Sequence, residues 1–347
     1  MIDLPQVFRS EQALRGAFVE GLERMLAGHP GLGVFILVLA NATYDSTIHQ
    51  RLKGRLRERF GELAGAVRDD LRAGRPLTAA PDDVLVFLKL MAVGLDHLEL
   101  SRVRQVGAFE LQFNPLRAYR PPRMSDVAVT RLYSPYDPNG FHFNKPFLQK
   151  EIFWSGEIGQ HRCRLLYNKF PFAELHGLLV IDAEDNKPQW FTQADHAAVW
   201  RTTRLLGQHL PGVGFGYNSH GAFASVNHQH LQMFVRSEGC YPVEAEQWQH
   251  SGGDRVYPLA CRVYQDMDAA WEHLHLLHES NTAYNLLYRP GRMYLLARRF
   301  QGSYQHAGWT GGFAWSEVCG AVTTFNSGDF ANLDEDVIFA EMEKLRI

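Results

Sequence analysis

Two histidines and a glutamine occupy alternate positions within residues 225–234 (SVNHQHLQMF). Alternate side chains of a β-strand point to the same face, so His228, His230 and Gln232 are predicted to line up along one side of a short strand. A neutral imidazole can attack phosphorus as a nucleophile, and an amide N–H can hold a phosphoryl oxygen as charge develops. The spacing therefore favours chemistry at a phosphate group held beside a nucleophilic histidine.

The three side chains suit different steps of such a reaction. Facing the α-phosphorus of a nucleoside diphosphate compound, His230 can expel the distal fragment and leave a nucleotidyl-histidine. The departing sugar phosphate or nucleotide is a weak base, so the amide of Gln232 suffices where a stronger acid would otherwise be needed. His228 is better placed to orient its neighbour or to hold the loop. The second ring nitrogen of His230 needs an acceptor that fixes its tautomer, most simply a backbone carbonyl.

The sequence before this strand is rich in glycine and polar residues. Residues 212–221 (GVGFGYNSHG) are predicted to form a flexible loop that feeds the histidine strand. Small residues and hydrogen-bond donors in such a loop are suited to surround a phosphate group.

Composition excludes several classes of protein. The chain has 347 residues, of which 46% are apolar, enough for a buried core. A formal net charge of −3 gives no global basic field, so nucleic acid is not expected as a partner. The start (MIDLPQ) lacks the pattern of a signal peptide, and the longest apolar run, residues 34–40, is too short to span a bilayer. We expect a cytoplasmic protein without membrane association.

Cysteine usage gives no sign of a metal site. The four cysteines are widely scattered and form no C-x-x-C pair, which argues against a cysteine zinc site and fits a reducing compartment. We therefore expect no metal and no cofactor. Residues 272–279 (EHLHLLHE) could suggest a metal cluster, but an amphipathic helix with Leu274 and Leu277 inward explains them better.

The elements that must position the histidines follow from periodicity. Residues 1–105 are predicted to be a mainly helical region, in which residues 34–40 fit either a buried strand or a buried helix segment. Residues 106–347 are predicted to be the catalytic domain. Its expected strands are residues 108–113, 127–129, 163–167 and 178–181, with a hairpin of residues 284–288 and 293–297. Helices are expected over residues 192–210, 266–279 and 334–346. Strands with interposed helices and hairpins predict an α+β fold with an antiparallel sheet.

Residues 228–232 (HQHLQ) resemble the signature of the transferase and phosphorylase branch of the histidine-triad superfamily. That branch contains galactose-1-phosphate uridylyltransferase, diadenosine tetraphosphate phosphorylase and the GDP-hexose phosphorylases, which act on GDP-galactose or GDP-glucose. The resemblance is greatest to the GDP-hexose phosphorylases and extends over roughly residues 106–315. It is carried further by residues 217–228 (YNSHGAFASVNH), 141–145 (FHFNK), 109–117 (FELQFNPLR) and 168–172 (NKFPF).

The resemblance implies a histidine-triad-like antiparallel sheet with flanking helices, and a role for each site residue. His230 would be the nucleophile, Gln232 the phosphate-positioning amide and His228 its catalytic neighbour. Residues of the phosphate loop would be Asn218, Ser219, Gly221 and Ser225, and residues near the nucleoside would be Asn168, Lys169 and His176. For His176 a structural strand histidine bonded to backbone is an equal alternative. The implied partners are a nucleoside diphosphate sugar and inorganic phosphate.

Several alternatives stay open at this stage. The same chemistry with another acceptor or donor gives a hexose-1-phosphate uridylyltransferase or a dinucleoside polyphosphate phosphorylase. A metal-dependent hydrolase would use His228 and His230 as ligands, and a catalytically silent module would only bind nucleotide. Residues 1–105 could cap the sheet, cover the site or mediate a homodimer. Arg298 and Arg299 fit a solvated strand end better than a phosphate contact, and Trp309, Phe313 and Trp315 fit a core or an interface better than base stacking.

Overall fold

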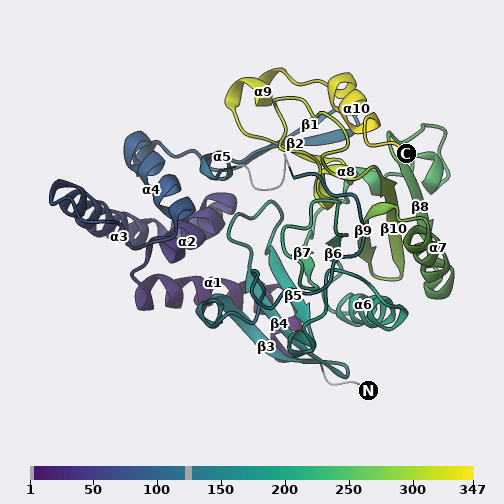
Figure 1. Ribbon diagram of the computed structural model, residues 1–347, viewed down its shortest axis with the longest axis horizontal. Helices are drawn as coiled ribbons and strands as arrows, with labels where there is room; N and C mark the ends of the chain where they lie inside the picture. Colours follow the sequence, from purple (N-terminus) through teal and green to yellow (C-terminus); the bar gives the residue numbers. More distant parts are fainter. Residues whose placement is uncertain (1–3, 122–126) are drawn as a thin grey trace.

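The computed structural model describes residues 4–121 and 127–347. The first three residues, on which the reading of the N-terminus partly depends, lie outside the described part. Helices alternate with strands after a helical start, as Figure 1 shows. The helices are α1 (Glu11–Gly28), α2 (Leu32–Tyr44), α3 (Ser46–Arg72), α4 (Pro81–Val93), α5 (Pro115–Tyr119), α6 (Gln193–Leu206), α7 (Met267–Glu279), α8 (Trp315–Val318), α9 (Ser327–Asn332) and α10 (Glu335–Glu343).

The strands form two sheets. The larger sheet has the order β3-β4-β5-β7-β6-β9-β10-β8, and every neighbouring pair in it is antiparallel. Its strands are β3 (Ile152–Ile158), β4 (His161–Tyr167), β5 (Gly177–Ile181), β6 (Val213–Asn218), β7 (Leu231–Val235), β8 (Ala260–Tyr264), β9 (Ala283–Arg289) and β10 (Arg292–Arg298). The smaller sheet joins β1 (Arg102–Val106), β2 (Phe109–Phe113) and β11 (Ala321–Thr324), with β11 parallel to β2. The predicted α+β fold with an antiparallel sheet is confirmed.

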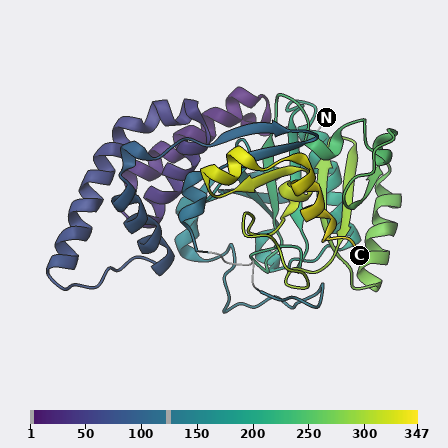
Figure 2. The same ribbon diagram turned by 90° about the horizontal axis from the view of Figure 1, so that it is seen from above.

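Helices α1 to α4 gather at one end of the molecule, and α1 packs against the edge strand β3 of the large sheet (Figures 1 and 2). Phe18 of α1 contacts the rings of Phe153 and Tyr167, and its carbonyl accepts the Tyr167 hydroxyl. Residues 34–40 lie in α2 and are buried, so a buried helix was the correct alternative. One apolar core runs from these helices into the sheet, and β1 straddles the boundary predicted at residue 105. The division into two regions stays a prediction.

Strand β6 replaces most of the flexible loop expected at residues 212–221. The prediction was wrong because its glycines serve packing rather than mobility. Gly216 lies opposite Gln232 in the register of β6 and β7. A methyl group at Gly216 would overlap the indole ring of Trp315, so the absent side chain makes room for that ring. All six residues of β6 are buried.

Two further expectations need correction. Residues 127–129 form no strand, and their backbone is bound by one distant residue, Gln301, instead of by a neighbouring strand. The Gln301 side chain donates to the Val127 carbonyl, and the Val129 N–H donates to the Gln301 carbonyl. Strand β7 begins only at Leu231, so His228 and His230 precede it in an irregular segment. The other predicted helices and the hairpin of β9 and β10 are present, with ends shifted by a few residues. None of the described helices is both long and apolar enough to cross a membrane.

Candidate active site

His230 is held as a buried, neutral imidazole. Its ring Nδ1 lies 2.9 Å from the carbonyl oxygen of His228, so Nδ1 carries the proton and donates it to that oxygen. This is the backbone acceptor that the sequence analysis expected. Burial lowers the pKa of His230 to about 4, and the His228 carbonyl only partly opposes that shift. The unprotonated Nε2 makes no hydrogen bond to any described residue, which leaves its lone pair for a ligand.

The backbone at His230 is held by a side chain instead of a neighbouring strand. Gln189 accepts the His230 N–H on Oε1 at 2.9 Å. Its Nε2 donates to the His230 carbonyl at 3.2 Å and to the Asn218 carbonyl at 2.9 Å. Gln189 is 2% exposed and lies in the segment before α6. Its amide thus makes the backbone hydrogen bonds that a neighbouring strand would otherwise make just before β7 begins. Nothing in the sequence indicated this role for Gln189, because no local motif surrounds it.

His228 is built into the wall of the site. Its Nδ1 accepts the backbone N–H of Phe143 at 3.0 Å, and the Phe143 ring stacks on it with centroids 5.6 Å apart. The same phenyl ring lies 5.0 Å from the ring of His230. Burial, and next the neighbouring His230, lower the pKa of His228 to about 4. With Nδ1 occupied as an acceptor and its carbonyl bound to His230, His228 is arranged to orient its neighbour.

Gln232 lies on β7 with its amide oxygen anchored. Its Oε1 accepts the indole N–H of Trp315 at 2.8 Å and lies 3.2 Å from His176 Nε2. Its NH₂ group makes no hydrogen bond to a described residue, and the side chain is half-buried. The amide therefore offers its two N–H donors to a ligand. Trp315 itself is fully buried and stacks on Phe234, which confirms it as a core residue.

The structure brings His176 and Asn168 to Gln232 from the loop between β4 and β5. His176 is 1% exposed, and burial, with the Arg117 charge nearby, lowers its pKa to about 3. Asn168 Nδ2 lies 3.2 Å from His176 Nε2, and its Oδ1 accepts the Phe170 N–H. Lys169 turns elsewhere, because its ammonium group forms an ion pair with Asp83 of α4. Lys169 is therefore paired within the protein, whereas the resemblance implies a position near the nucleoside.

Of the four residues expected in the phosphate loop, three are buried in or beside the sheet and one is exposed. Asn218 ends β6, and its Oδ1 accepts from Asn285 Nδ2 at 2.7 Å and from the Trp315 backbone N–H at 2.8 Å. Ser219 is buried and its Oγ accepts the Tyr284 N–H, so it extends the pairing with β9. Gly221 has a φ of +85°, which a side chain would strain. Ser225 is exposed in the segment leading to His228.

Three other predictions about charged or metal-binding residues can be compared with the structure. Arg298 is 1% exposed, so the expectation of a solvated strand end was wrong for it: its guanidinium bonds to Asn285, Tyr304 and the Phe313 carbonyl. Residues 272–279 lie in α7 with Leu274 and Leu277 buried, which confirms the amphipathic helix. Over residues 4–121 and 127–347, no three His, Cys, Asp or Glu side chains are grouped so that they could hold a metal ion.

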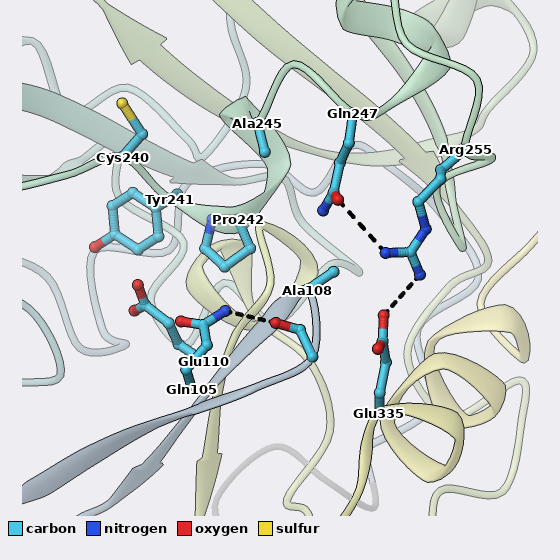
Figure 3. Close-up of a pocket in the computed structure, with 11 residues that line it drawn as sticks. Gln105, Ala108, Glu110, Cys240, Tyr241, Pro242, Ala245, Gln247, Arg255 and Glu335 are labelled. Carbon is cyan, nitrogen blue, oxygen red and sulfur yellow. Dashed lines mark hydrogen bonds and ion pairs between the residues drawn. The ribbon is translucent and has the colours of Figure 1, made fainter.

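A surface hollow of about 400 Å³ lies elsewhere, between β1, β2, α10 and residues 240–247 (Figure 3). Its charged groups are already paired: Arg255 with Glu335, and Glu110 with Arg236. None of the predicted site residues lines it. The candidate active site is therefore the region around His230 and not this hollow.

The depressed pKa of His230 predicts the acid limb of the pH profile for any reaction in which its Nε2 attacks as a nucleophile. A neutral imidazole attacks and an imidazolium does not, so the rate constant falls only as pH approaches the folded-state pKa of about 4. We expect the single-turnover rate constant of such a reaction to be flat from about pH 8 to about pH 5.5. An imidazole with the ordinary pKa of about 6.5 would already be about nine-tenths protonated at pH 5.5. A midpoint near 6.5 in protein that remains folded by circular dichroism would contradict this assignment.

The sequence comparisons cover the central part of the chain. Residues 89–234 match the family model described as "GDPGP1-like, N-terminal domain". The chain is 33% identical over 139 residues to GDP-D-glucose phosphorylase 1 of Danio rerio, a match that covers 40% of this chain and 39% of that protein. The chain therefore aligns with about two fifths of the length of this curated relative.

The comparison with solved structures identifies a yeast protein of similar fold. The crystal structure of yeast Ap4A phosphorylase Apa2 is similar with a TM-score of 0.50 and 16% identity, and the match covers 78% of this chain and 97% of that one. The same yeast protein in complex with Ap4A gives a TM-score of 0.49 at 16% identity, over 78% of this chain and 100% of that one. At this identity the similarity concerns the fold.

Proposed function

We propose that this chain, which is related to the GDP-hexose phosphorylases of the histidine-triad superfamily, cleaves a nucleoside diphosphate sugar with inorganic phosphate. One observation carries the proposal. His230 is a buried neutral imidazole whose proton is held on Nδ1 by the His228 carbonyl, so the lone pair of Nε2 is available for attack. Two residues further along the chain, Gln232 has a free NH₂ group, because its amide oxygen is bound by Trp315. The relative named GDP-D-glucose phosphorylase 1 makes a GDP-hexose the first substrate to test.

In the first step His230 Nε2 attacks the α-phosphorus in line. A nitrogen–phosphorus bond forms as the bond between that phosphorus and the bridging oxygen breaks, and hexose 1-phosphate departs with the electron pair. The ring becomes positively charged while Nδ1 keeps its proton, and the hydrogen bond to the His228 carbonyl strengthens. The NH₂ group of Gln232 donates to a non-bridging phosphoryl oxygen as charge develops there.

In the second step an oxygen of inorganic phosphate attacks the same phosphorus from the opposite direction. The nitrogen–phosphorus bond breaks, nucleoside diphosphate is released and the neutral imidazole is restored. Two in-line displacements retain configuration at phosphorus and give ping-pong kinetics. Because the low pKa of His230 disfavours a protonated free ring, its departure as neutral imidazole suits this step.

Contacts around the histidine support the other roles. Gln189 and the His228 carbonyl fix the His230 backbone and ring. Asn218 has its oxygen bound within the protein, which leaves its NH₂ group for a phosphate, and exposed Ser225 adds a hydroxyl. Ser219 and Gly221 shape the backbone between β6 and the histidines. We further propose that the enzyme is cytoplasmic and forms a homodimer.

Intact-mass spectrometry after mixing the protein with GDP-, UDP- or ADP-hexose in the absence of phosphate tests the function directly. Without an acceptor the intermediate accumulates, and we expect a mass increase equal to one nucleotidyl group, that is GMP less one water, with the GDP-sugar. Added phosphate should remove the adduct and release nucleoside diphosphate. A protein that turns over the sugar nucleotide but never carries an adduct contradicts a nucleotidyl-histidine.

The same measurement separates the related activities. An adduct that forms with UDP-hexose and is discharged by hexose 1-phosphate instead of phosphate identifies a uridylyltransferase. An adduct that forms only with a dinucleoside polyphosphate identifies a dinucleotide phosphorylase. Bound nucleotide without adduct or product identifies a silent binding module, and activity lost with stoichiometric zinc on chelation identifies a metal-dependent hydrolase.

A further inference from the structure

The orientation of the Gln232 amide is decided by its partners. An indole N–H is a donor and never an acceptor, so the Gln232 atom that faces Trp315 at 2.8 Å is the carbonyl oxygen. The NH₂ group must then project to the other side of the amide. If the amide turned over, two N–H groups would face the indole N–H without an acceptor. Trp315 therefore selects one of the two orientations of Gln232.

His176 selects the same orientation of the Gln232 amide, because it presents a second donor to the same oxygen. Its Nδ1 accepts the backbone N–H of Phe172 at 3.2 Å, so the neutral ring carries its proton on Nε2. That proton points to Gln232 Oε1 at 3.2 Å. Asn168 Nδ2 also lies 3.2 Å from Nε2, but two N–H groups cannot bond to each other, so this tautomer directs its one Nε2 proton to Gln232. Burial and the nearby Arg117 charge hold the pKa of His176 near 3, so the ring remains in this neutral tautomer around neutral pH. Two donors thus converge on one oxygen.

The space left by the missing side chain of Gly216 forms a slot that holds the Trp315 indole beside the Gln232 oxygen. The indole lies over Gly216, the residue that pairs with Gln232 across β6 and β7, and no side chain fits there beside it. On its other flank the indole stacks on Phe234 with an interplanar angle of 14°. Trp315 begins α8, and its backbone N–H donates to Asn218 Oδ1. The ring therefore has little freedom to leave the Gln232 oxygen.

We infer that Trp315 and His176 are positioning residues that clamp the Gln232 carbonyl oxygen, so that its NH₂ group is presented to the phosphoryl oxygen of the substrate. The inference rests on the proposed function. It assigns His176 a task different from substrate binding, because both ring nitrogens are occupied within the protein. It adds Trp315, which lies outside the region matched by the family model.

Trp315→Phe tests the clamp, because it removes the indole N–H while keeping an aromatic ring in the slot. We expect the single-turnover rate constant for loading GMP from a GDP-hexose to fall about tenfold, the effect of one oriented hydrogen bond. Gln232→Ala should lower the same constant by about 10²-fold, because the donor itself is lost. Binding of the sugar nucleotide should change less than loading, since the contact strengthens in the transition state.

Trp248→Phe is the matched control. Trp248 is as fully buried as Trp315 and belongs to the same core cluster, but its N–H donates to the Pro242 carbonyl at 2.7 Å. We expect this variant to lose thermal stability comparably and to load nucleotide within about twofold of wild type. Equal losses of loading in both tryptophan variants would reduce the effect of Trp315 to general core packing and overturn the clamp.

The double variant Trp315→Phe with Gln232→Ala decides whether Trp315 acts through Gln232. If it does, the tryptophan substitution has almost no further effect once the amide is gone. A full tenfold loss in the Gln232→Ala background, or loading by Trp315→Phe at the wild-type rate, overturns the inference. If wild-type protein never acquires an adduct, the proposed function fails. If wild type and Trp315→Phe load nucleotide equally well, the proposed function stands and only the clamp is refuted.

Discussion

Replacement of His230 by alanine is expected to abolish nucleotide loading and phosphorolysis, with a loss of about 10⁴-fold or more. The reason is that the two neighbouring histidines are not arranged to take its place. His228 Nδ1 accepts from Phe143, so its Nε2 carries the proton, and both ring nitrogens of His176 are bound within the protein. The measurement is single-turnover loading with a GDP-hexose, followed by intact mass and by release of hexose 1-phosphate.

His230→Ala should remain folded. The one side-chain hydrogen bond that His230 makes among the described residues goes to the carbonyl of His228, two positions away, so no long-range hydrogen bond is lost. His250→Ala is the matched control, because His250 also bonds a backbone carbonyl, that of Val243 at 2.7 Å. We expect the control to load nucleotide at the wild-type rate. Near wild-type turnover by His230→Ala would refute a covalent intermediate on this residue.

Gln189→Leu should have the second largest effect, on stability and on activity together. The leucine fits a similar volume but leaves the His230 N–H, the His230 carbonyl and the Asn218 carbonyl without partners. Each unsatisfied buried group costs about 1–3 kcal/mol, so we expect the free energy of unfolding to fall by roughly 3 kcal/mol or more. Because the imidazole then loses its fixed backbone, loading should slow by about 10²-fold.

Gln229→Leu provides the comparison for that variant. Gln229 is adjacent to His230 and similarly buried, but its side chain donates a single hydrogen bond, to the Trp190 carbonyl at 2.7 Å. We expect its loss to cost about 1–3 kcal/mol and to leave loading within a few-fold of wild type. Denaturant unfolding and single-turnover loading measure both quantities. Similar loading rates in the two variants would show that Gln189 does not position the nucleophile.

The way the site is built explains why it lies outside the hollow of Figure 3. The groups that surround His230 are rings and amides already bonded to one another, among them Phe143, Gln189 and Trp315. Such a preorganised wall requires no reorientation of its dipoles when charge develops on the phosphoryl group. The hollow in Figure 3, in contrast, is lined by charges that neutralise one another, and nothing in it resembles a nucleophile with an oriented base.

The sequence by itself indicated most of the local elements and the groups that we propose to react. Apolar spacing identified the helices of the N-terminal region and α7, and a turn between two apolar runs identified the hairpin of β9 and β10. The alternation of His228, His230 and Gln232 indicated the chemistry, and the surrounding segments indicated the family relationship that the comparisons support. These features are encoded within a few neighbouring residues. The strand alternation expected for the histidines is nevertheless absent, because β7 begins only at Leu231.

Only the tertiary structure decided how the reacting groups are held. Gln189 lies 41 positions before His230, and Trp315 lies 83 positions after Gln232, so no local pattern links either pair. The glycines of β6 indicate flexibility when read locally, yet in the sheet Gly216 makes room for an indole. The tautomer of His176 and the direction of the Gln232 amide depend on these distant partners, because sheet register and side-chain packing, not chain proximity, determine which donor meets which acceptor.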